Sequence, residues 1–288
     1  MTWGRENPKS ESLRSEQCMP LANYKSRAKR GIPSSDLGFR VFGFILAITV
    51  FFSFQPAFAF SFAVFGDNHG NLRMLSDIFS RIKADKSIEF AVNTGDFVND
   101  GSAEEYKAYA DFVSREGVRV YNVMGNHDAC RGAYRSFAKY FGPDYYSFDR
   151  GNAHFIVLDN SFRGTFDKKQ FDFLESELKA NRNKVLFVFF HKPNFDPSNV
   201  YSDYVMSERQ MSEKMTGLFE KYRVRYVFTG HIHAYLKAER NGVVYIVTGG
   251  SGGVLHLPAM MGGFYHYIKV TVDGDRVKDE VMRLYKDI

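Results

Sequence analysis

The sequence predicts an α/β fold with a mixed β-sheet, and two patterns carry this prediction. Short apolar runs rich in Val, Ile, Phe and Tyr recur along the chain, and most of them are separated by segments whose apolar residues have helical spacing. After Tyr222 the apolar runs follow one another more closely, which favours hairpin connections. Strands joined by helices run parallel and strands joined by hairpins run antiparallel, so we expect both kinds of pairing.

The expected strands share the length and composition of buried strands. They cover residues 62–65, 88–94, 118–124, 153–158, 185–190, 224–229, 243–248 and 264–272. The expected helices share a spacing of apolar residues that places them on one helix face. They cover residues 72–82, 102–115, 133–140, 171–178 and 211–222. Asn71 is a suitable N-cap for the first helix.

The N-terminal part of the chain has the pattern of a leader. A basic cluster precedes an apolar stretch, and residues 41–66 carry no charge. The stretch ends at Pro56 and Ala57-Phe58-Ala59, which has the small-x-small pattern of a signal peptidase site. We therefore expect residues 1–59 to be an N-terminal leader and the protein to be exported, either periplasmic or secreted.

Two fates are open for this leader. About 20 apolar residues can span a bilayer, so residues 41–59 could remain as a membrane anchor. Cleavage as a signal peptide is favoured, because the first predicted strand starts only three positions after Ala59 and leaves no linker between a membrane helix and the sheet. Residues 60–288 contain no linker or repeat, and we expect them to form one domain.

The charge distribution gives no support for a nucleic-acid partner. The chain has 38 Lys and Arg against 33 Asp and Glu, a net charge of +5. Residues 1–40 hold eight of these bases and four of the acids, which leaves 30 bases and 29 acids in residues 41–288. A nucleic-acid binder places its basic excess on the folded domain, because phosphate neutralisation drives binding. We therefore expect no nucleic-acid binding.

Polar side chains gather where the predicted strands end. Five of the eight apolar runs finish in a short polar segment, usually with a glycine just before it, where the backbone can turn sharply or approach a ligand closely. In an open α/β sheet the carboxyl ends of the strands line the ligand crevice, so these segments can converge. Their residues are Asp67 and His69, Asp96, Asn126 to Asp128, His191, and His231 and His233.

These residue types suit a pair of divalent metal ions. Imidazole and carboxylate ligands together favour Mn, Fe or Zn, and the lack of thiolates argues against a structural zinc site. In two-metal hydrolases the ions lie about 3.5–4 Å apart, which needs a shared carboxylate, and Asp96 is the natural candidate. Two divalent ions with Asp67, Asp96 and a hydroxide would leave a net charge of about +1 that attracts phosphate.

Together these segments resemble the calcineurin-like metallophosphoesterase superfamily. Its five ordered motifs, D-x-H, G-D-x-x-x-D, G-N-H-[D/E], a single H, and G-H-x-H, are all present between Phe62 and His233. The resemblance implies a four-layer αββα sandwich of two mixed β-sheets flanked by helices. It also implies a metal-dependent phosphoesterase that hydrolyses phosphate mono- or diesters by in-line attack of a metal-bridging hydroxide.

The resemblance further implies a role for each site residue. Asp67, His69, Asp96 and His233 would bind the first metal ion, and Asp96, Asn126, His191 and His231 the second. His127 would face the phosphate, where it stabilises the transition state or protonates the leaving oxygen, and Asp128 would orient its ring.

The subfamily is open on sequence grounds. Asn99 stands where purple acid phosphatases have a tyrosine, and the Asp-Arg-Gly sequence of protein Ser/Thr phosphatases is absent. The chain is therefore similar to the broad bacterial group that contains cyclic-nucleotide phosphodiesterases and many phosphatases. We expect a phosphorylated small molecule or ester as substrate. The alternatives are a specific cyclic-nucleotide phosphodiesterase, against which export argues, and a non-catalytic metal-binding protein.

Three other histidines and one loop need an interpretation. His154 lies inside a predicted strand, and we expect it to be structural. His256 and His266 lie near glycine-rich loops and could line the substrate pocket, but a structural role is favoured for both. Residues 193–204 directly follow His191, and we expect them to shape substrate access.

Overall fold

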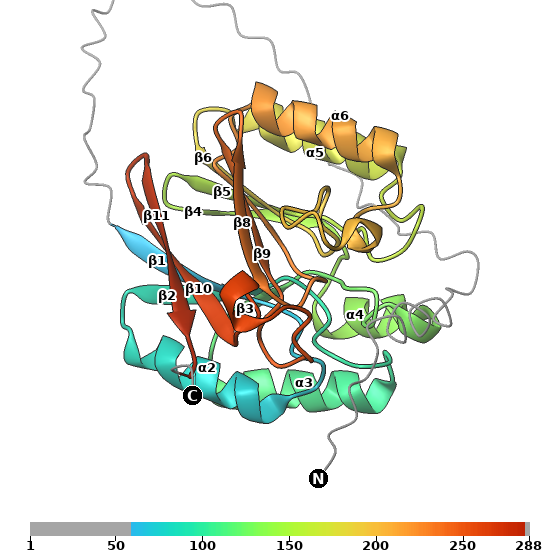
Figure 1. Cartoon of the computed structure of the whole chain (residues 1–288), viewed down its shortest axis with the longest axis vertical. Helices are drawn as coiled ribbons and strands as arrows, with labels where there is room; N and C mark the ends of the chain where they lie inside the picture. The colour runs from blue at the N-terminus through green and yellow to red at the C-terminus, as the bar shows by residue number, and fades with distance from the viewer. Residues whose placement is uncertain (1–58, 286–288) are drawn as a thin grey trace, which may run out of the picture.

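Two β-sheets pack face to face, and helices cover the outer face of each in the computed structural model, which describes residues 59–285 (Figure 1). The expected four-layer sandwich of two mixed sheets is therefore confirmed. The predicted leader, apart from Ala59, lies outside the described residues. Within the described part, no helix is long and apolar enough to cross a membrane.

The first sheet has five strands. In spatial order they are β11 (Arg276–Arg283), β10 (His266–Asp273), β1 (Phe60–Phe65), β2 (Ile88–Asn93) and β3 (Val120–Asn122). The strands β1, β2 and β3 run parallel, whereas β10 is antiparallel to both β1 and β11.

The second sheet has six strands. In spatial order they are β4 (Tyr146–Arg150), β5 (Ala153–Val157), β6 (Val185–Phe189), β7 (Tyr226–Thr229), β9 (Val243–Thr248) and β8 (Tyr235–Arg240). The four central strands run parallel and the two edge strands are antiparallel to their neighbours. β8 and β9 form a hairpin, and so do β10 and β11. Hairpins were expected after Tyr222, but each of these two contains a strand that was not predicted, and the predicted neighbours β7 and β9 pair parallel.

Alternating side chains divide each sheet between two cores. On β1, Phe62 and Val64 face the second sheet, whereas Ala63 and Phe65 face the helices. Aromatic rings fill the layer between the sheets: the Phe62 ring is parallel to that of Phe90 at 5.3 Å and meets the edge of Phe155 at 5.2 Å. This packing holds the two sheets in one fixed arrangement.

Three helices cover the first sheet and two cover the second (Figure 1). They are α2 (Leu72–Ala84), α3 (Ala103–Glu116) and α4 (Tyr134–Tyr140), then α5 (Lys168–Ala180) and α6 (Arg209–Lys221). The Asn71 side chain accepts a hydrogen bond from Met74 N at 3.1 Å, so the predicted N-cap is confirmed.

The sequence patterns missed three strands, and all three are edge strands. These are β4, β8 and β11, whose sequences YSFDR, YLKAER and RVKDEVMR mix apolar residues with charged ones. An edge strand keeps one face and one side in water, and charged residues there hinder pairing with another chain. The resulting alternation breaks the apolar run by which a buried strand is recognised.

Candidate metal centre

The seven predicted metal ligands lie together at the carboxyl ends of the parallel strands of both sheets. Asp67 and His69 follow β1, Asp96 follows β2 and Asn126 follows β3, while His191 follows β6 and His231 and His233 follow β7. Because the two sheets face each other, their strand ends form one cluster. Three sets of side chains in this cluster each offer ligand atoms that all lie within 4.8 Å of one another. They are Asp67, His69 and His233; Asp96, His191 and His231; and His69, Asp96 and His127. The first two sets belong to the two predicted ligand groups.

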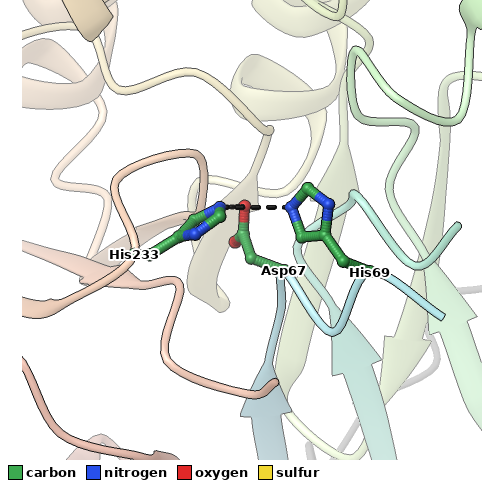
Figure 2. Close-up of side chains that lie close together, drawn as sticks. All are labelled: Asp67, His69 and His233. Carbon is green, nitrogen blue, oxygen red and sulfur yellow. Dashed lines mark hydrogen bonds and ion pairs between the residues drawn. The ribbon is translucent and has the colours of Figure 1, made fainter. Parts of the chain in front are cut away.

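The first group contains Asp67, His69 and His233. The Nε2 atoms of the two histidines face each other at 3.1 Å, and His233 Nε2 lies 3.5 Å from Asp67 Oδ1. Figure 2 shows the two rings approaching from opposite sides of the Asp67 carboxylate. Such spacings are those of atoms that can share one ion.

The second group contains Asp96, Asn126, His191 and His231. The Nε2 atom of His191 lies 3.2 Å from Asp96 Oδ2, 3.0 Å from Asn126 Oδ1 and 3.2 Å from His231 Nδ1. The same Asp96 oxygen lies 3.8 Å from His69 Nε2 of the first group. Asp96 is therefore the residue that stands between the two groups.

Four of these ligands have strained backbones. Asp67, His69, Asp96 and His231 all have positive φ angles, of 59°, 44°, 54° and 68°, in a region that residues other than glycine rarely adopt. Each such residue costs of order 1–3 kcal/mol and persists only where its surroundings hold it. Here the fold stores strain in the segments that aim the ligands.

Glycine is required beside Asp96 because the strand ends approach one another so closely. A Cβ atom on Gly125 would lie 2.1 Å from Asp96 Oδ1, and one on Gly95 would lie 2.7 Å from His191 Nδ1. Gly95 also has a φ of 104°. The glycines that precede the polar segments thus allow the ligands to converge.

Backbone carbonyl groups orient the histidine rings. His191 Nδ1 donates to Thr94 O at 2.9 Å, and His233 Nδ1 donates to Val254 O at 2.7 Å. These bonds fix the proton on Nδ1 and leave Nε2 to face the cluster, as in histidine ligands of known metal sites. Asn160 Oδ1 accepts hydrogen bonds from the backbone N–H groups of His191 and Lys192, each at 3.0 Å, and so holds the loop after β6.

The charges of the cluster fit cations. Asp67 and Asp96 are both buried, and Asp67 Oδ2 has no hydrogen-bond partner among the described residues. Burial disfavours a charged His191, but the carboxylates of Asp96 and Asp67 and the hydrogen bond to Thr94 together outweigh it and raise the pKa of His191 to about 9. Buried carboxylates need a compensating positive charge. The donor set of carboxylates, imidazoles and one amide therefore suits divalent metal ions.

His127 lies beside the cluster, but Asp128 does not orient it. The His127 ring meets that of His69 at 4.6 Å between centroids, and its Nδ1 donates to the carbonyl oxygen of Asn99 at 2.6 Å. That carbonyl is held by Glu105, whose Oε2 accepts from Asn99 N and Asp100 N, each at 3.0 Å. The expectation that Asp128 orients the ring is wrong, because both its oxygens face backbone N–H groups.

Asp128 instead clamps the loop that carries Asp96. Its buried carboxylate accepts hydrogen bonds from Asp96 N and Gly125 N, each at 2.8 Å, and from Phe97 N and Val98 N at 3.0 and 3.1 Å. Burial raises the pKa of Asp128, and the N–H groups of Gly125 and Val98 oppose that rise. The clamp joins the ends of β2 and β3.

Two of the remaining histidines are structural and one borders the cluster. His154 pairs with Asp149 and Glu177, and His266 lies buried between Thr248 and Phe264 O, as expected. His256 differs from its expected role: its ring stacks on His233 at 4.1 Å between centroids. No local pattern marks this residue, because a loop far along the chain brings it there.

Asn160 was also missed, although the sequence carries a signal for it. The strand β5 (Ala153–Val157) and Leu158 are followed by Asp159-Asn160-Ser161, a sixth polar segment after an apolar run.

A four-layer sandwich with this cluster at its strand ends is typical of metal-dependent phosphoesterases. The model of the calcineurin-like phosphoesterase family matches residues 60–235. The chain belongs to this family, as the order of its motifs indicated.

Curated relatives cover part of the chain. A 3′,5′-cyclic-nucleotide phosphodiesterase of Nostoc sp. is 27% identical over 164 residues, which are 55% of this chain and 61% of the relative. A purple acid phosphatase of Glycine max is 37% identical over 113 residues, which are 38% of this chain and 24% of the relative. The chain thus matches about three fifths of the first relative and about a quarter of the second.

Solved structures share the fold at low sequence identity. A dimetal phosphatase from Danio rerio superposes with a TM-score of 0.64 at 14% identity, covering 81% of this chain and 98% of that one. A protein described as the anchor in the inner membrane complex of Plasmodium has a TM-score of 0.63 at 16% identity, covering 79% and 85%. These likenesses support the fold alone.

Proposed function

We propose that this protein is a dinuclear metal-dependent hydrolase of phosphate mono- or diesters. The observation that carries the proposal is the pair of ligand groups with Asp96 between them and His127 at their edge. Asp67, His69, Asp96 and His233 would hold one ion, and Asp96, Asn126, His191 and His231 the other. Mn, Fe or Zn would suit these donors.

When bound, the two ions would polarise the phosphoryl oxygen and lower the pKa of water in the site. The chain's own contribution is orientation. The proton on His127 Nδ1 is engaged by Asn99 O, so Nε2 is the ring atom available to a phosphoryl or leaving oxygen. The Asp128 clamp keeps Asp96 in its strained conformation, and the carbonyls of Thr94 and Val254 keep two imidazoles aimed.

The experiment is a comparison of substrates with the full chain and added Mn²⁺. Turnover of p-nitrophenyl phosphate, its bis-ester and cyclic AMP is measured for the wild type, Asp96→Asn and His127→Ala. We expect Asp96→Asn to abolish turnover and His127→Ala to lower it by about 10²–10⁴-fold, the usual contribution of a positioned acid or base. Unchanged turnover in both variants would refute the proposal.

Two alternatives are tested by the same assay. A specific cyclic-nucleotide phosphodiesterase is supported by the Nostoc relative, and it would hydrolyse cyclic AMP in strong preference to the nitrophenyl esters. A non-catalytic metal-binding protein would bind Mn²⁺ and turn over none of the three.

We also propose that the protein is exported, with residues 1–59 as its leader. The support is the basic cluster, the apolar stretch and the Ala57-Phe58-Ala59 site. The N-terminal sequence of the mature protein decides between the two fates: a start at Phe60 indicates cleavage, whereas an intact leader in the membrane fraction indicates an anchor.

A further inference from the structure

One side of the metal centre is formed by aromatic side chains that the phosphoesterase assignment does not use. We call Tyr201, Tyr204 and His256 the aromatic wall. The His256 ring stacks on His233, and Tyr204 lies 5.4 Å from His256 and 5.6 Å from His231 between ring centroids. The wall therefore contacts one histidine of each ligand group.

The fold holds this wall in place. Tyr201 Oη donates to His256 O at 2.6 Å, and His233 N donates to His256 Nδ1 at 3.2 Å. Both tyrosines also pack against the buried cluster that contains Ile232 and Leu236. The rings are thus a positioned part of the site.

The segments that carry the wall offer no positive charge. Residues 241–268 contain no Asp, Glu, Lys or Arg, and residues 193–208 contain three acids but no Lys or Arg. At the edge of the wall, Val254 is 66% exposed and Val200 is 54% exposed. These two segments therefore supply no Lys or Arg to a second anionic group, whereas they offer an apolar ring aromatic faces and exposed valines.

The row of imidazole rings places the wall relative to His127. Between centroids, His127 lies 4.6 Å from His69, His69 lies 4.8 Å from His233, and His233 lies 4.1 Å from His256. These contacts link His127 to the wall through His69 and His233. A diester with its leaving oxygen beside His127 therefore lies next to rings that continue to the wall.

We propose that the aromatic wall binds the retained ester group of a phosphodiester, and that this group is an uncharged aromatic ring. The inference rests on the proposed phosphoesterase function and names its substrate class.

Two diesters with the same leaving group test the inference. Bis(p-nitrophenyl) phosphate and methyl p-nitrophenyl phosphate both release p-nitrophenolate, but the first retains an aryl group and the second a methyl group. With the full chain and Mn²⁺, we expect a kcat/KM about tenfold higher for the aryl diester. Tyr204→Ala is expected to lower kcat/KM for the aryl diester more than for the methyl diester and so to remove this preference.

Further variants separate binding from folding. Tyr204→Leu keeps the apolar contact with the buried cluster and should lose the same preference. Tyr285→Ala truncates an exposed tyrosine that follows β11 and donates to Asp77 of α2, and it should change turnover of neither substrate. Calorimetry should show diphenyl phosphate binding about tenfold more weakly to the Tyr204 variants, and dimethyl phosphate binding unchanged.

The outcomes that oppose the inference are distinct. Turnover of the methyl diester without an aryl preference overturns the role of the wall and leaves the phosphoesterase function standing. An equal loss on both diesters in Tyr204→Leu also overturns it, because the tyrosine would then be structural only. Turnover of neither diester by the wild type overturns the phosphodiesterase function and this inference with it.

Discussion

Replacing Asp128 by asparagine should weaken both the fold and the metal centre, because this carboxylate joins the ends of β2 and β3. Its two oxygens accept four backbone N–H groups, and the asparagine amide keeps only one oxygen. Two buried N–H groups would then face an NH₂ group that cannot accept. Each unsatisfied buried donor costs about 1–3 kcal/mol, so the free energy of unfolding should fall by about 2–6 kcal/mol.

Urea unfolding followed by circular dichroism, in EDTA, measures this change directly. The expected loss is a large fraction of the free energy of unfolding of a typical domain, which is roughly 5–15 kcal/mol. Asp100→Asn is the matched control: Asp100 accepts from Ser102 N and pairs with exposed Arg131, so its loss should cost about 1 kcal/mol or less. A second readout is Mn²⁺ affinity, which should fall in Asp128→Asn because Asp96 is no longer held at its positive φ. Unfolding free energy within about 0.5 kcal/mol of the wild type, with unchanged Mn²⁺ affinity, would refute the clamp.

Three further predictions follow from the same geometry. Glu105→Ala should lower turnover by roughly tenfold in the wild type but not in the His127→Ala variant, because Glu105 acts on the His127 ring through Asn99 O. Equal losses of turnover in both backgrounds would contradict this role of Glu105. Removal of metal ions by EDTA should lower the Tm. Addition of Mn²⁺ to a free concentration of 1,000 times its Kd should then raise the free energy of unfolding by about 4 kcal/mol. A Tm that EDTA does not change would argue against buried cation sites. Burial lowers the pKa of His266 to about 4, below its unfolded value of about 6.5. As the pH drops from 6.5 to 4, the unfolded chain takes up a proton first, so the free energy of unfolding should fall by up to about 1.4 kcal/mol per pH unit. Urea titrations at pH 7 and 5 should show a smaller fall in His266→Gln.

Most of the fold was predictable because its buried strands and helices leave local patterns. A parallel strand covered on both faces is apolar throughout, as in β6 with its sequence VLFVF, and a helix on the outer face shows helical spacing, as in α2. The edge strands β4, β8 and β11 left no such pattern, because each is only partly covered. These edge strands form because each pairs with the strand beside it in the folded sheet, a contact that the local sequence does not show.

The metal-centre residues were predictable for a related reason. The polar residues lie one or two positions after a predicted apolar run, so recognition of the run also located the polar residue at its end. They are Asp67, Asp96, Asn126, His191 and His231. Parallel strands bring such ends to one edge whatever the spacing along the chain.

The sequence by itself determined the family, the buried strands and the set of candidate ligands, because these depend on residue type and local spacing. Only the tertiary structure decided which partner each side chain has. In the structure the carbonyl oxygen of Asn99, and not Asp128, orients the His127 ring, and Tyr204 and His256 lie beside the metal centre. Such contacts join residues from separate loops, and their geometry exists only after the two sheets have packed together.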